Sequence, residues 1–262
     1  MTVGLVVDGG ASIPEECWPS PLAWVPMHLE PGADGEATTA APSPGEFLQA
    51  ITEADDGDGV VVVTVASRLS ASFAAAAAAI QLVGQEHEVA LVDSESATAG
   101  QGLVALAAAR AAAAGRPLKA VADAAQEAAA RVRLVAQIER LDRLARGGRL
   151  PASLATATRL TGLRPIFSLA KGQIRPLRPA FSLAAAEYRI LAAWRRSERR
   201  DAWLHVAAIH AGAQDSAERL LARLGAFCRP STSFVTELSP VMLEHTGVGV
   251  SGLCWWWEEQ AT

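Results

Sequence analysis

Short apolar runs alternate with polar or glycine turns and helical segments through the first half of the chain. Runs of β-branched and aliphatic residues end near Asp8, at Thr64 and near Asp93, and an alanine-rich segment follows the second and the third. Continuous apolar strands that alternate with helices indicate a parallel sheet covered on both faces. The pattern therefore predicts an N-terminal α/β unit, with one helix ending near Val83 and another near Gly115.

The segment between the first two strands is rich in Pro, Gly and Thr and predicts a surface excursion. It leads into a helix with a clear start, because Ser43 fits the N-cap, Pro44 the first helical position and Glu46 the third position of a capping box. Thr38 and Thr39 are expected in the loop before this helix.

The second half of the chain has a different pattern, which predicts an α+β or mixed-sheet unit. Helices are expected at residues 117–133, 139–150 with Gly147 as the cap, 183–197 and 215–224. Strands are expected at residues 134–138, on both sides of the turn at Lys171 and Gly172, at 203–211 and at 249–257. We therefore expect two domains, residues 1–125 and 126–262.

Length, charge and cysteine content narrow the class of protein. The 262 residues carry a net charge of −5, and their scattered Lys and Arg lack interleaved aromatics, so nucleic-acid binding is not expected. No apolar run is long enough to span a membrane and the N-terminus lacks a cleavable signal, so a cytoplasmic location is expected. The three cysteines are far apart and lack metal-ligand spacing, so neither a disulfide framework, a zinc site nor a cofactor is expected.

Polar turns follow the three predicted parallel strands at residues 8–10, 67–72 and 93–98, and we expect all three at one edge of the sheet. In such sheets ligands bind outside the carboxyl ends of the strands, where helix N-termini present free N–H groups. Ser67, Ser70 and Ser72 lie in the turn between a strand and an alanine helix, so they either hold an anion or cap the helix. The residues alone leave both interpretations open.

A glycine-rich segment near the C-terminus follows His245. Residues 247–252 match the pattern GxGxxG, but too little chain follows them for a βαβ unit, so a dinucleotide site is not predicted. The imidazole of His245 is a candidate ligand-binding group beside this flexible turn.

Seven short motifs, in order along the chain, resemble those of one known family. They are DGGASIP (8–14), TAAPSPGEF (39–47), ASRLSASFAAA (66–76), LVDSESATAGQG (91–102), LDRLARGGRLP (141–151), RPIFSLAKGQIRP (164–176) and HTGVGVSG (245–252). Each motif is weak alone, but the ordered set resembles the DegV family of bacterial fatty-acid-binding proteins along almost the whole chain.

The resemblance implies an N-terminal parallel-sheet, Rossmann-like domain and a C-terminal mixed α/β domain, with one fatty acid in a tunnel between them. Carried over motif by motif, the carboxylate ligands fall on Thr39, Ser70 and His245, with Ser67 and Ala71 as further ligand-binding positions in the serine turn. The resemblance also implies that the protein does no chemistry. It would present the acyl chain to a separate fatty-acid kinase, which makes acyl phosphate for phospholipid synthesis.

The chain departs from the family pattern at several positions. Gly9 and Gly10 replace a Ser-Thr pair in the first turn, Ala71 replaces the glycine of the serine turn, Ala40 replaces a second hydroxyl beside the threonine, and Arg164 replaces a lysine. Because alanine disfavours a left-handed backbone, Ala71 is expected to reshape the serine turn.

Two other functions stay open. Ser70 and His245 are also suited to a small-molecule hydrolase or phosphotransfer enzyme, although the chain has no nucleophile elbow. Alternatively, the protein is an interaction module whose pocket has decayed, with Trp255, Trp256 and Trp257 at an interface. The three functions differ in whether a lipid binds, a substrate turns over, or side chains fill the space between the domains.

Overall fold

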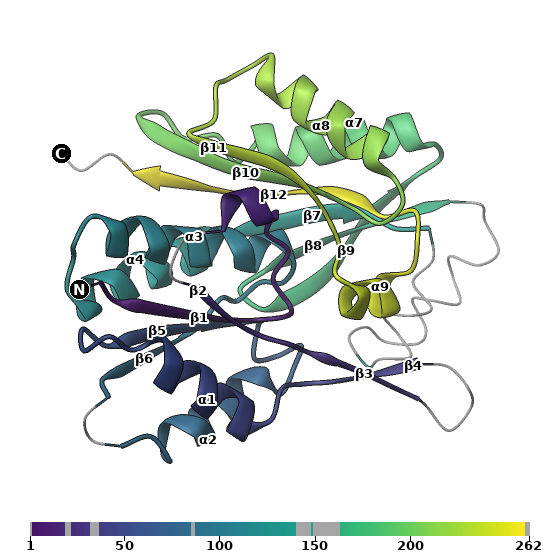
Figure 1. Ribbon diagram of the computed structural model, residues 1–262. Helices are drawn as coiled ribbons and strands as arrows, with labels where there is room; N and C mark the ends of the chain where they lie inside the picture. Colours follow the sequence, from purple (N-terminus) through teal and green to yellow (C-terminus); the bar gives the residue numbers. More distant parts are fainter. Residues whose placement is uncertain are drawn as a thin grey trace.

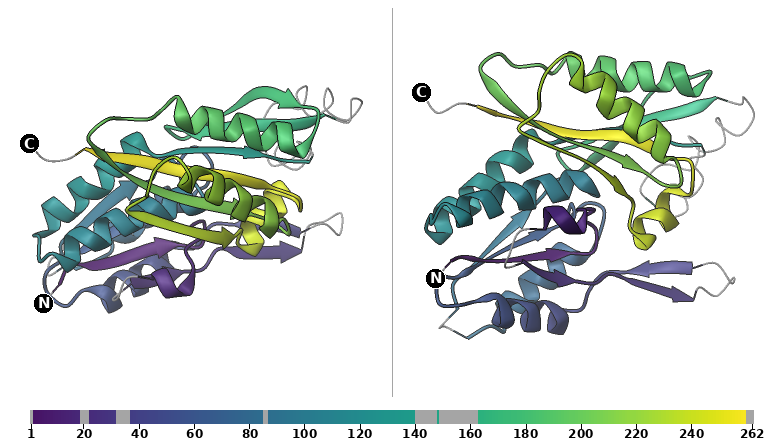
Figure 2. Two further views of the ribbon diagram at one scale, coloured as in Figure 1. Left: turned by 90° about the horizontal axis from the view of Figure 1, so that it is seen from above. Right: turned by 45° about the horizontal axis from the view of Figure 1, so that its top comes forward.

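The chain folds into stacked layers of helices and sheets. The computed structural model describes residues 2–18, 22–31, 37–84, 87–139, 148 and 163–259. Two sheets enclose one pair of helices, and each sheet carries another helix pair on its outer face (Figures 1 and 2). This arrangement gives three buried apolar layers, and the central one joins the two sheets.

The first sheet is parallel, with the strand order β2-β1-β5-β6. Its strands are β1 (Gly4–Asp8), β2 (Leu22–Val25), β5 (Val60–Thr64) and β6 (Val89–Asp93). Its helices are α1 (Pro44–Ala54) and α2 (Ser72–Ile80) on the outer face, and α3 (Ala99–Ala113) and α4 (Leu118–Arg131) on the inner face. Every residue of β5 is buried, as its continuous apolar run predicted.

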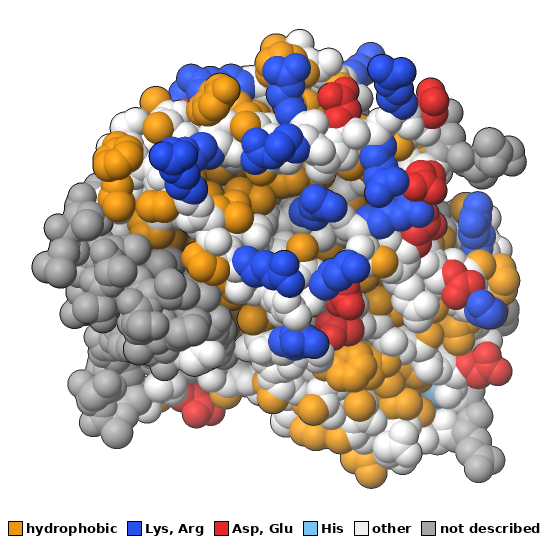
Figure 3. All heavy atoms as spheres, turned by 180° about the vertical axis from the view of Figure 1, so that it is seen from behind, with side chains coloured by type: hydrophobic (Ala, Val, Ile, Leu, Met, Phe, Trp, Pro, Cys, Tyr) orange, Lys and Arg blue, Asp and Glu red, His pale blue; other side chains and the backbone are white. Residues whose placement is uncertain are grey.

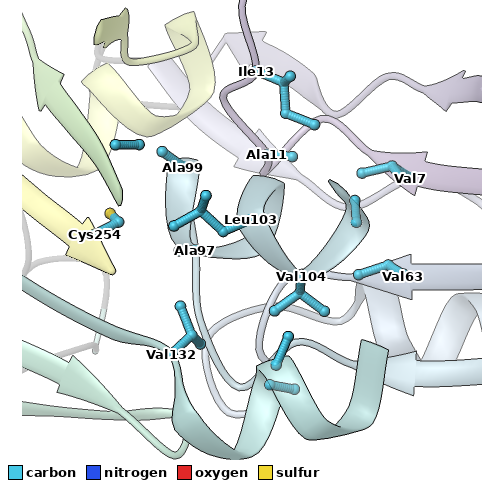
Figure 4. Packing of buried hydrophobic residues seen from close by; sticks show 14 of the residues in the cluster. Val7, Ala11, Ile13, Val63, Ala97, Ala99, Leu103, Val104, Val132 and Cys254 are labelled. Carbon is cyan, nitrogen blue, oxygen red and sulfur yellow. The ribbon is translucent and has the colours of Figure 1, made fainter. Parts of the chain in front are cut away.

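Helix α3 lies in the central layer and is buried on nearly all sides. Its residues are mostly Ala and Gly, and such small side chains let the helix pack closely between two sheets. Figure 4 shows Leu103 and Val104 of α3 among Val7 and Val63 of the parallel sheet, with Cys254 of the second sheet on another side.

The second sheet is mixed, with the strand order β11-β10-β12-β7-β8-β9. Its strands are β7 (Arg133–Gln137), β8 (Arg164–Ala170), β9 (Gln173–Ala180), β10 (Ala202–His210), β11 (Thr232–Glu237) and β12 (Ser251–Glu259). Only β10 and β11 pair in parallel, and the other neighbours are antiparallel. Helices α7 (Leu183–Arg195) and α8 (Gln214–Gly225) cover its outer face.

Most of the described elements match the sequence-based expectation, and the α/β class is confirmed. The sequence did not indicate the strands β2 and β11, the hairpin of β3 (His28–Pro31) and β4 (Ala37–Ala40), the short 3-10 helix η1 (Glu15–Cys17), or α9 (Pro240–Thr246). The helix expected at residues 139–150, with its cap at Gly147, lies mostly outside the described residues. The expected domain boundary after residue 125 falls within α4 and stays a prediction.

The start of α1 is confirmed in detail. The Ser43 hydroxyl accepts a hydrogen bond from the Glu46 N–H (3.3 Å), and the Glu46 carboxylate accepts one from the Ser43 N–H (2.7 Å), which forms the predicted capping box. The preceding segment differs from expectation, because Thr38 and Thr39 lie in β4 and not in a loop.

The C-terminal tryptophans are buried. Trp255, Trp256 and Trp257 are 1%, 2% and 7% exposed in β12, and their rings pack on both faces of the mixed sheet. They therefore serve the core of this chain and offer no exposed aromatic interface.

His205 on β10 is a buried imidazole with fixed partners. Its ring nitrogens lie 2.9 Å from Thr232 Oγ1 and 2.8 Å from Glu258 Oε2, and the ring stacks on Trp256. Burial and the positive charge of Arg110 lower the pKa of His205 to about 4, against the opposing effect of Glu258. The folded protein therefore holds this ring neutral at pH values where the unfolded chain is protonated.

This difference predicts a loss of stability on acidification. As pH falls from about 6.5 to 4, the unfolded chain gains a proton at His205 that the fold does not accept, which destabilises the fold by about 3 kcal/mol. Urea unfolding across this pH range measures the free energy of unfolding. His205→Gln should lack the part of its decrease that is caused by protonation of His205. The exposed-site control His28→Gln should retain it, and an unchanged loss in His205→Gln would contradict the assignment.

Candidate functional site

Three turns meet at the carboxyl edge of the parallel sheet, after β1, β5 and β6. The Ala66 N–H donates to the Ser96 carbonyl (2.8 Å), and the Thr98 N–H donates to the Gly10 carbonyl (2.9 Å). These two backbone hydrogen bonds connect the turn after β6 to the serine turn on one side and to the turn after β1 on the other. The expectation that these three polar turns share one edge is confirmed.

Asp8, at the end of β1, organises the base of this edge. Its carboxylate accepts hydrogen bonds of 2.9 Å from the Gly10 N–H, the Val65 N–H and the Gln101 side-chain amide. Burial raises the pKa of the Asp8 carboxyl, although these donors and the Ser72 hydroxyl act to lower it. One buried carboxylate therefore joins β1, β5, α2 and α3.

The serine turn separates its three hydroxyls. The Ser70 hydroxyl lies 3.1 Å from the Ser72 hydroxyl and accepts a hydrogen bond from the Ser72 N–H (3.2 Å) at the start of α2. Ser72 is fully buried, whereas Ser67 is exposed and its N–H donates to the Asp93 carboxylate. Of the three, Ser70 accepts from the first N–H of α2 and also lines the pocket described below.

Ala71 does not produce the expected backbone conflict. It has φ −76° and ψ −3°, which is a right-handed conformation open to any residue. The turn therefore does not use the left-handed conformation for which glycine would be needed.

Thr39 and His245 come together although 206 residues separate them. Thr39 Oγ1 in β4 lies 2.9 Å from Nε2 of His245 in the last turn of α9. His245 is thus helical and not in a loop, but the expected glycine turn follows it, with positive φ at Gly247 and Gly249.

Helix α9 is held against the first turn by its N-cap. The Ser239 hydroxyl accepts from the Met242 N–H (3.4 Å) and lies 3.2 Å from the Gly9 carbonyl, to which it donates. Pro240 occupies the first turn of the helix, as its fixed φ favours.

A pocket lies between this edge and the inner face of the mixed sheet. Together with its open mouth it encloses about 670 Å³. The lining residues are Met27, Val65, Leu69, Ser70, Ala97, Thr98, Leu134, Phe167, Leu169, Ile174, Ile209, Leu238, Met242, His245, Thr246 and Val250. The described part of this lining is mostly apolar and contains no Lys, Arg, Asp or Glu, so it suits a ligand with a long apolar part and one small polar group.

The predicted site residues are partly brought together. Ser70 and His245 line the pocket, and Thr39 reaches it through its contact with His245. Ser67 and Ala71 are exposed and are not among the residues that line it. Which of these five side chains contact a ligand stays a prediction.

Thr98 lines the pocket; the sequence placed it at this edge of the sheet but did not single it out as a site residue. It has φ 55° and ψ −138°, a strained conformation for a β-branched residue, and is 5% exposed. Its hydroxyl lies 3.8 Å from the Cys254 sulfur, whose pKa is raised to about 12 by burial, so this thiol stays protonated. No sequence pattern indicates a positive φ at threonine.

Gly10, which replaces a hydroxyl-bearing residue of the family pattern in the first turn, has a structural reason. A Cβ at this position would lie 2.8 Å from Gln101 Oε1, 2.9 Å from Asp8 Oδ1 and 2.9 Å from Val65 Cβ. The Gln101 amide thus occupies the space that a side chain at position 10 would need.

Restoring a family-like hydroxyl at this position is expected to destabilise the fold. Gly10→Thr should lower the free energy of unfolding by about 2 kcal/mol because the added atoms overpack the site. In a Gln101→Ala background the same change should cost at least about 1 kcal/mol less, as a double-mutant cycle by urea unfolding would show. Gly45→Thr, at an open helix position, is the control, and equal costs in both backgrounds would contradict the account.

Charge and composition set further limits on the site. Within the described part of the chain, no group of three or more His, Cys, Asp or Glu side chains could hold a metal ion. Likewise, the described helices include none that is long and apolar enough to cross a membrane. Figure 3 shows Lys and Arg side chains spaced apart on one face, with apolar and acidic side chains between them.

Comparison with known proteins places the chain in a family. The model of the family described as "Uncharacterised protein, DegV family" matches residues 27–258. The chain belongs to the DegV family. Among its relatives, the DegV domain-containing protein Rv2417c of Mycobacterium tuberculosis is 34% identical over 278 residues, covering 97% of each chain. Protein DegV of Bacillus subtilis is 27% identical and covers 89% of this DegV chain and 84% of its own.

Solved DegV structures have the same fold. A DegV family protein of Thermus thermophilus, described with fatty-acid binding, superposes with a TM-score of 0.87 at 24% identity, covering 98% of this chain and 100% of its own. Bacillus subtilis DegV, described as a fatty acid binding protein, gives a TM-score of 0.81 at 24% identity with the same coverage. At these identities the similarity establishes the two-sheet α/β fold.

Proposed function

We propose that this DegV-family chain binds one long-chain fatty acid in the pocket between its two sheets. The observation that carries the proposal is the pocket itself, which combines an apolar lining with the Ser70 hydroxyl and the His245 imidazole. Thermus thermophilus and Bacillus subtilis relatives of the same fold, described as binding fatty acids, support it. An apolar pocket that contains a hydroxyl and an imidazole favours a ligand site over an interaction module with a decayed site.

The proposed ligand divides its interactions between chain and headgroup. About fifteen buried methylenes offer roughly 12 kcal/mol of gross transfer free energy, part of which is lost in immobilising the chain. The carboxylate would accept hydrogen bonds from Ser70 and His245, with Thr39 orienting the imidazole through its 2.9 Å contact. In this arrangement hydroxyl and imidazole groups would hold the carboxylate, and no Lys or Arg of the described residues lines the pocket to form a salt bridge with it. The carboxylate oxygens would therefore stay accessible.

This accessibility supports the finer part of the proposal, in which a separate fatty-acid kinase phosphorylates the bound carboxylate. The acyl tail would lie in a tunnel along the mixed sheet, over Leu134, Phe167 and Leu169. Incubation of the palmitate-loaded protein with such a kinase and ATP should yield palmitoyl phosphate. If the kinase phosphorylated free palmitate as well as it phosphorylates palmitate bound to this protein, the proposed kinase partnership would be contradicted.

Palmitate should raise the melting temperature of the delipidated protein. Ligand at about 100 times its Kd stabilises the fold by about 2.7 kcal/mol, which corresponds to several degrees for a chain of this size. Hexanoate, with the same headgroup and little chain to bury, is the control and should have no measurable effect. No shift with palmitate or oleate would contradict fatty-acid binding.

The enzyme alternative makes a different prediction. A hydrolase would need the Ser70 hydroxyl paired with His245 as its base, whereas the hydrogen bonds identified for these side chains join Ser70 to Ser72 and His245 to Thr39. Turnover of chromogenic esters or phosphates that disappears in Ser70→Ala would overturn the proposal that this chain is a carrier.

A further inference from the structure

The glycine turn that follows His245, residues 247–250, is held in place by the mixed sheet. The Gly249 N–H donates to the Ala211 carbonyl (2.7 Å), just after the end of β10. On its other side the Gly249 carbonyl accepts a hydrogen bond from the side-chain amide of Gln137, the last residue of β7. Gly249 has φ +82°, so the turn has a backbone that depends on glycine. A backbone contact and a side-chain contact therefore fix the turn together.

Gln137 reaches this turn from the face of the sheet opposite the pocket. Successive residues of a strand point to opposite faces, and the neighbouring Ala136 packs in the central layer. The Gln137 side chain therefore points into the outer layer, where it is fully buried. A buried amide costs free energy unless its hydrogen bonds are made, so its partners show what it holds.

The partners of Gln137 fix the orientation of its amide. Its Oε1 accepts a hydrogen bond from the Arg164 guanidinium (3.1 Å), which can only donate. Its Nε2 therefore faces the Gly249 carbonyl and the Ser251 hydroxyl, the latter at 3.1 Å. In the flipped orientation the amide oxygen would face the Gly249 carbonyl, and two acceptors would repel each other. Arg164 thus sets the direction of the donor that holds the glycine turn.

A buried polar network connects Gln137 to the two outer helices. Ser251 Oγ lies 2.9 Å from Ser216 Oγ of α8, and Ser216 Oγ lies 2.8 Å from the Glu187 carboxylate of α7. All three side chains are buried. Hydrogen-bond networks in a low-dielectric interior rigidify the elements that they join. The amide of Gln137 is therefore held by the sheet and by both helices behind it.

We propose that Gln137 is a positioning residue for the fatty-acid carboxylate. Its amide, oriented by Arg164, holds the glycine turn, and this turn directly follows α9, whose last turn carries His245. The inference rests on the proposed function, in which the His245 imidazole donates to the carboxylate. Gln137 is not among the residues that line the pocket, so it would act on the ligand through His245.

Gln137→Glu tests the proposal with a change that conserves shape. The carboxylate keeps its contact with Arg164 but places an acceptor against the Gly249 carbonyl, which should displace the turn. Palmitate should bind about fivefold more weakly, as measured by isothermal titration calorimetry on delipidated protein. Gln173→Glu is the matched control, because Gln173 also accepts from an arginine of this sheet, Arg175 (2.9 Å), and is not among the lining residues. It should bind palmitate as wild type.

A double-mutant cycle with His245→Leu distinguishes positioning from a general structural effect. In this background Gln137→Glu should weaken palmitate binding no further, because the group that it positions is gone. Equal weakening with and without His245 would overturn the proposal. So would an affinity of Gln137→Glu equal to that of the wild type.

Arg164→Met carries the same test if urea unfolding shows that Gln137→Glu does not fold. Arg164 is only partly buried, and its loss frees the Gln137 amide to rotate away from the turn. Palmitate binding should weaken about twofold in the presence of His245 and stay unchanged in the His245→Leu background. The opposite pattern, or no effect in either background, would overturn the proposal.

The ring signals of His245 in NMR spectra give a measurement that does not depend on palmitate. In the ligand-free, ¹⁵N-labelled protein they should shift in Gln137→Glu, or in Arg164→Met, and stay unchanged in Gln173→Glu. Unchanged His245 signals in the first two variants would overturn the positioning role. A wild-type protein that binds no palmitate would instead refute the fatty-acid site, so the two failures are distinguishable.

Discussion

Replacing Ser70 by Ala and His245 by Leu together should weaken palmitate binding about 100-fold. Each change removes a hydrogen-bond donor to a carboxylate, and such bonds contribute about 1.5–3 kcal/mol each, so two of them exceed the roughly 3 kcal/mol that 100-fold requires. The apolar lining is unchanged, so palmitate should still bind more tightly than hexanoate. Isothermal titration calorimetry on delipidated protein measures the ratio of palmitate Kd values between variant and wild type, and the ratio of hexanoate to palmitate Kd values in the variant.

The serine turn itself offers the matched control. Ser67→Ala removes a hydroxyl three residues from Ser70, but this side chain is exposed and is not among those that line the pocket. Its palmitate affinity should equal that of the wild type within about twofold. If the double variant also binds as wild type, the carboxylate lies elsewhere and the proposed anchor is wrong.

Asp8→Ala should lower the free energy of unfolding by about 4 kcal/mol. The variant leaves the buried N–H groups of Gly10 and Val65 and the Gln101 amide without their acceptor, and each such loss costs about 1–3 kcal/mol. Urea unfolding at pH 7 measures the change. Because Asp8 joins β1, β5, α2 and α3 beneath the serine turn, the variant should also bind palmitate more weakly than wild type.

Asp123→Ala is the matched control for this change. Asp123 is exposed on α4 and forms an exposed ion pair with Lys119, so its loss should change the free energy of unfolding by less than about 0.5 kcal/mol. A cost at Asp8 as small as that at Asp123 would show that the carboxylate does not organise the sheet edge.

The strands and capped helices could be predicted because their signals are local. The apolar run of β5 and the capping box at Ser43 depend on neighbouring residues, and both are confirmed. The hairpin β3–β4 carried no such signal, because its exposed strands contain Pro31 and Glu30 and lack alternating apolar residues. It is positioned by contacts with α9, which lies 200 residues away in the chain.

The candidate site could be predicted only in part, for the same reason. The motif resemblance located Thr39, Ser70 and His245, and the structure joins the first and last of these by a hydrogen bond that no local pattern indicates. The fit of Gln101 against Gly10 and the positive φ of Thr98 depend on how α3 packs between the sheets. Ala71 shows the opposite case, since a substitution that conflicts with the family motif fits the backbone without strain.

Native mass spectrometry of the protein purified from bacteria tests the central claim most directly. The account predicts one bound fatty acid per chain, identified after denaturing extraction, and rebinding of one palmitate or oleate by the delipidated protein. A chain that carries no lipid after purification and takes up neither fatty acid after delipidation would contradict the assignment of this pocket as a fatty-acid site.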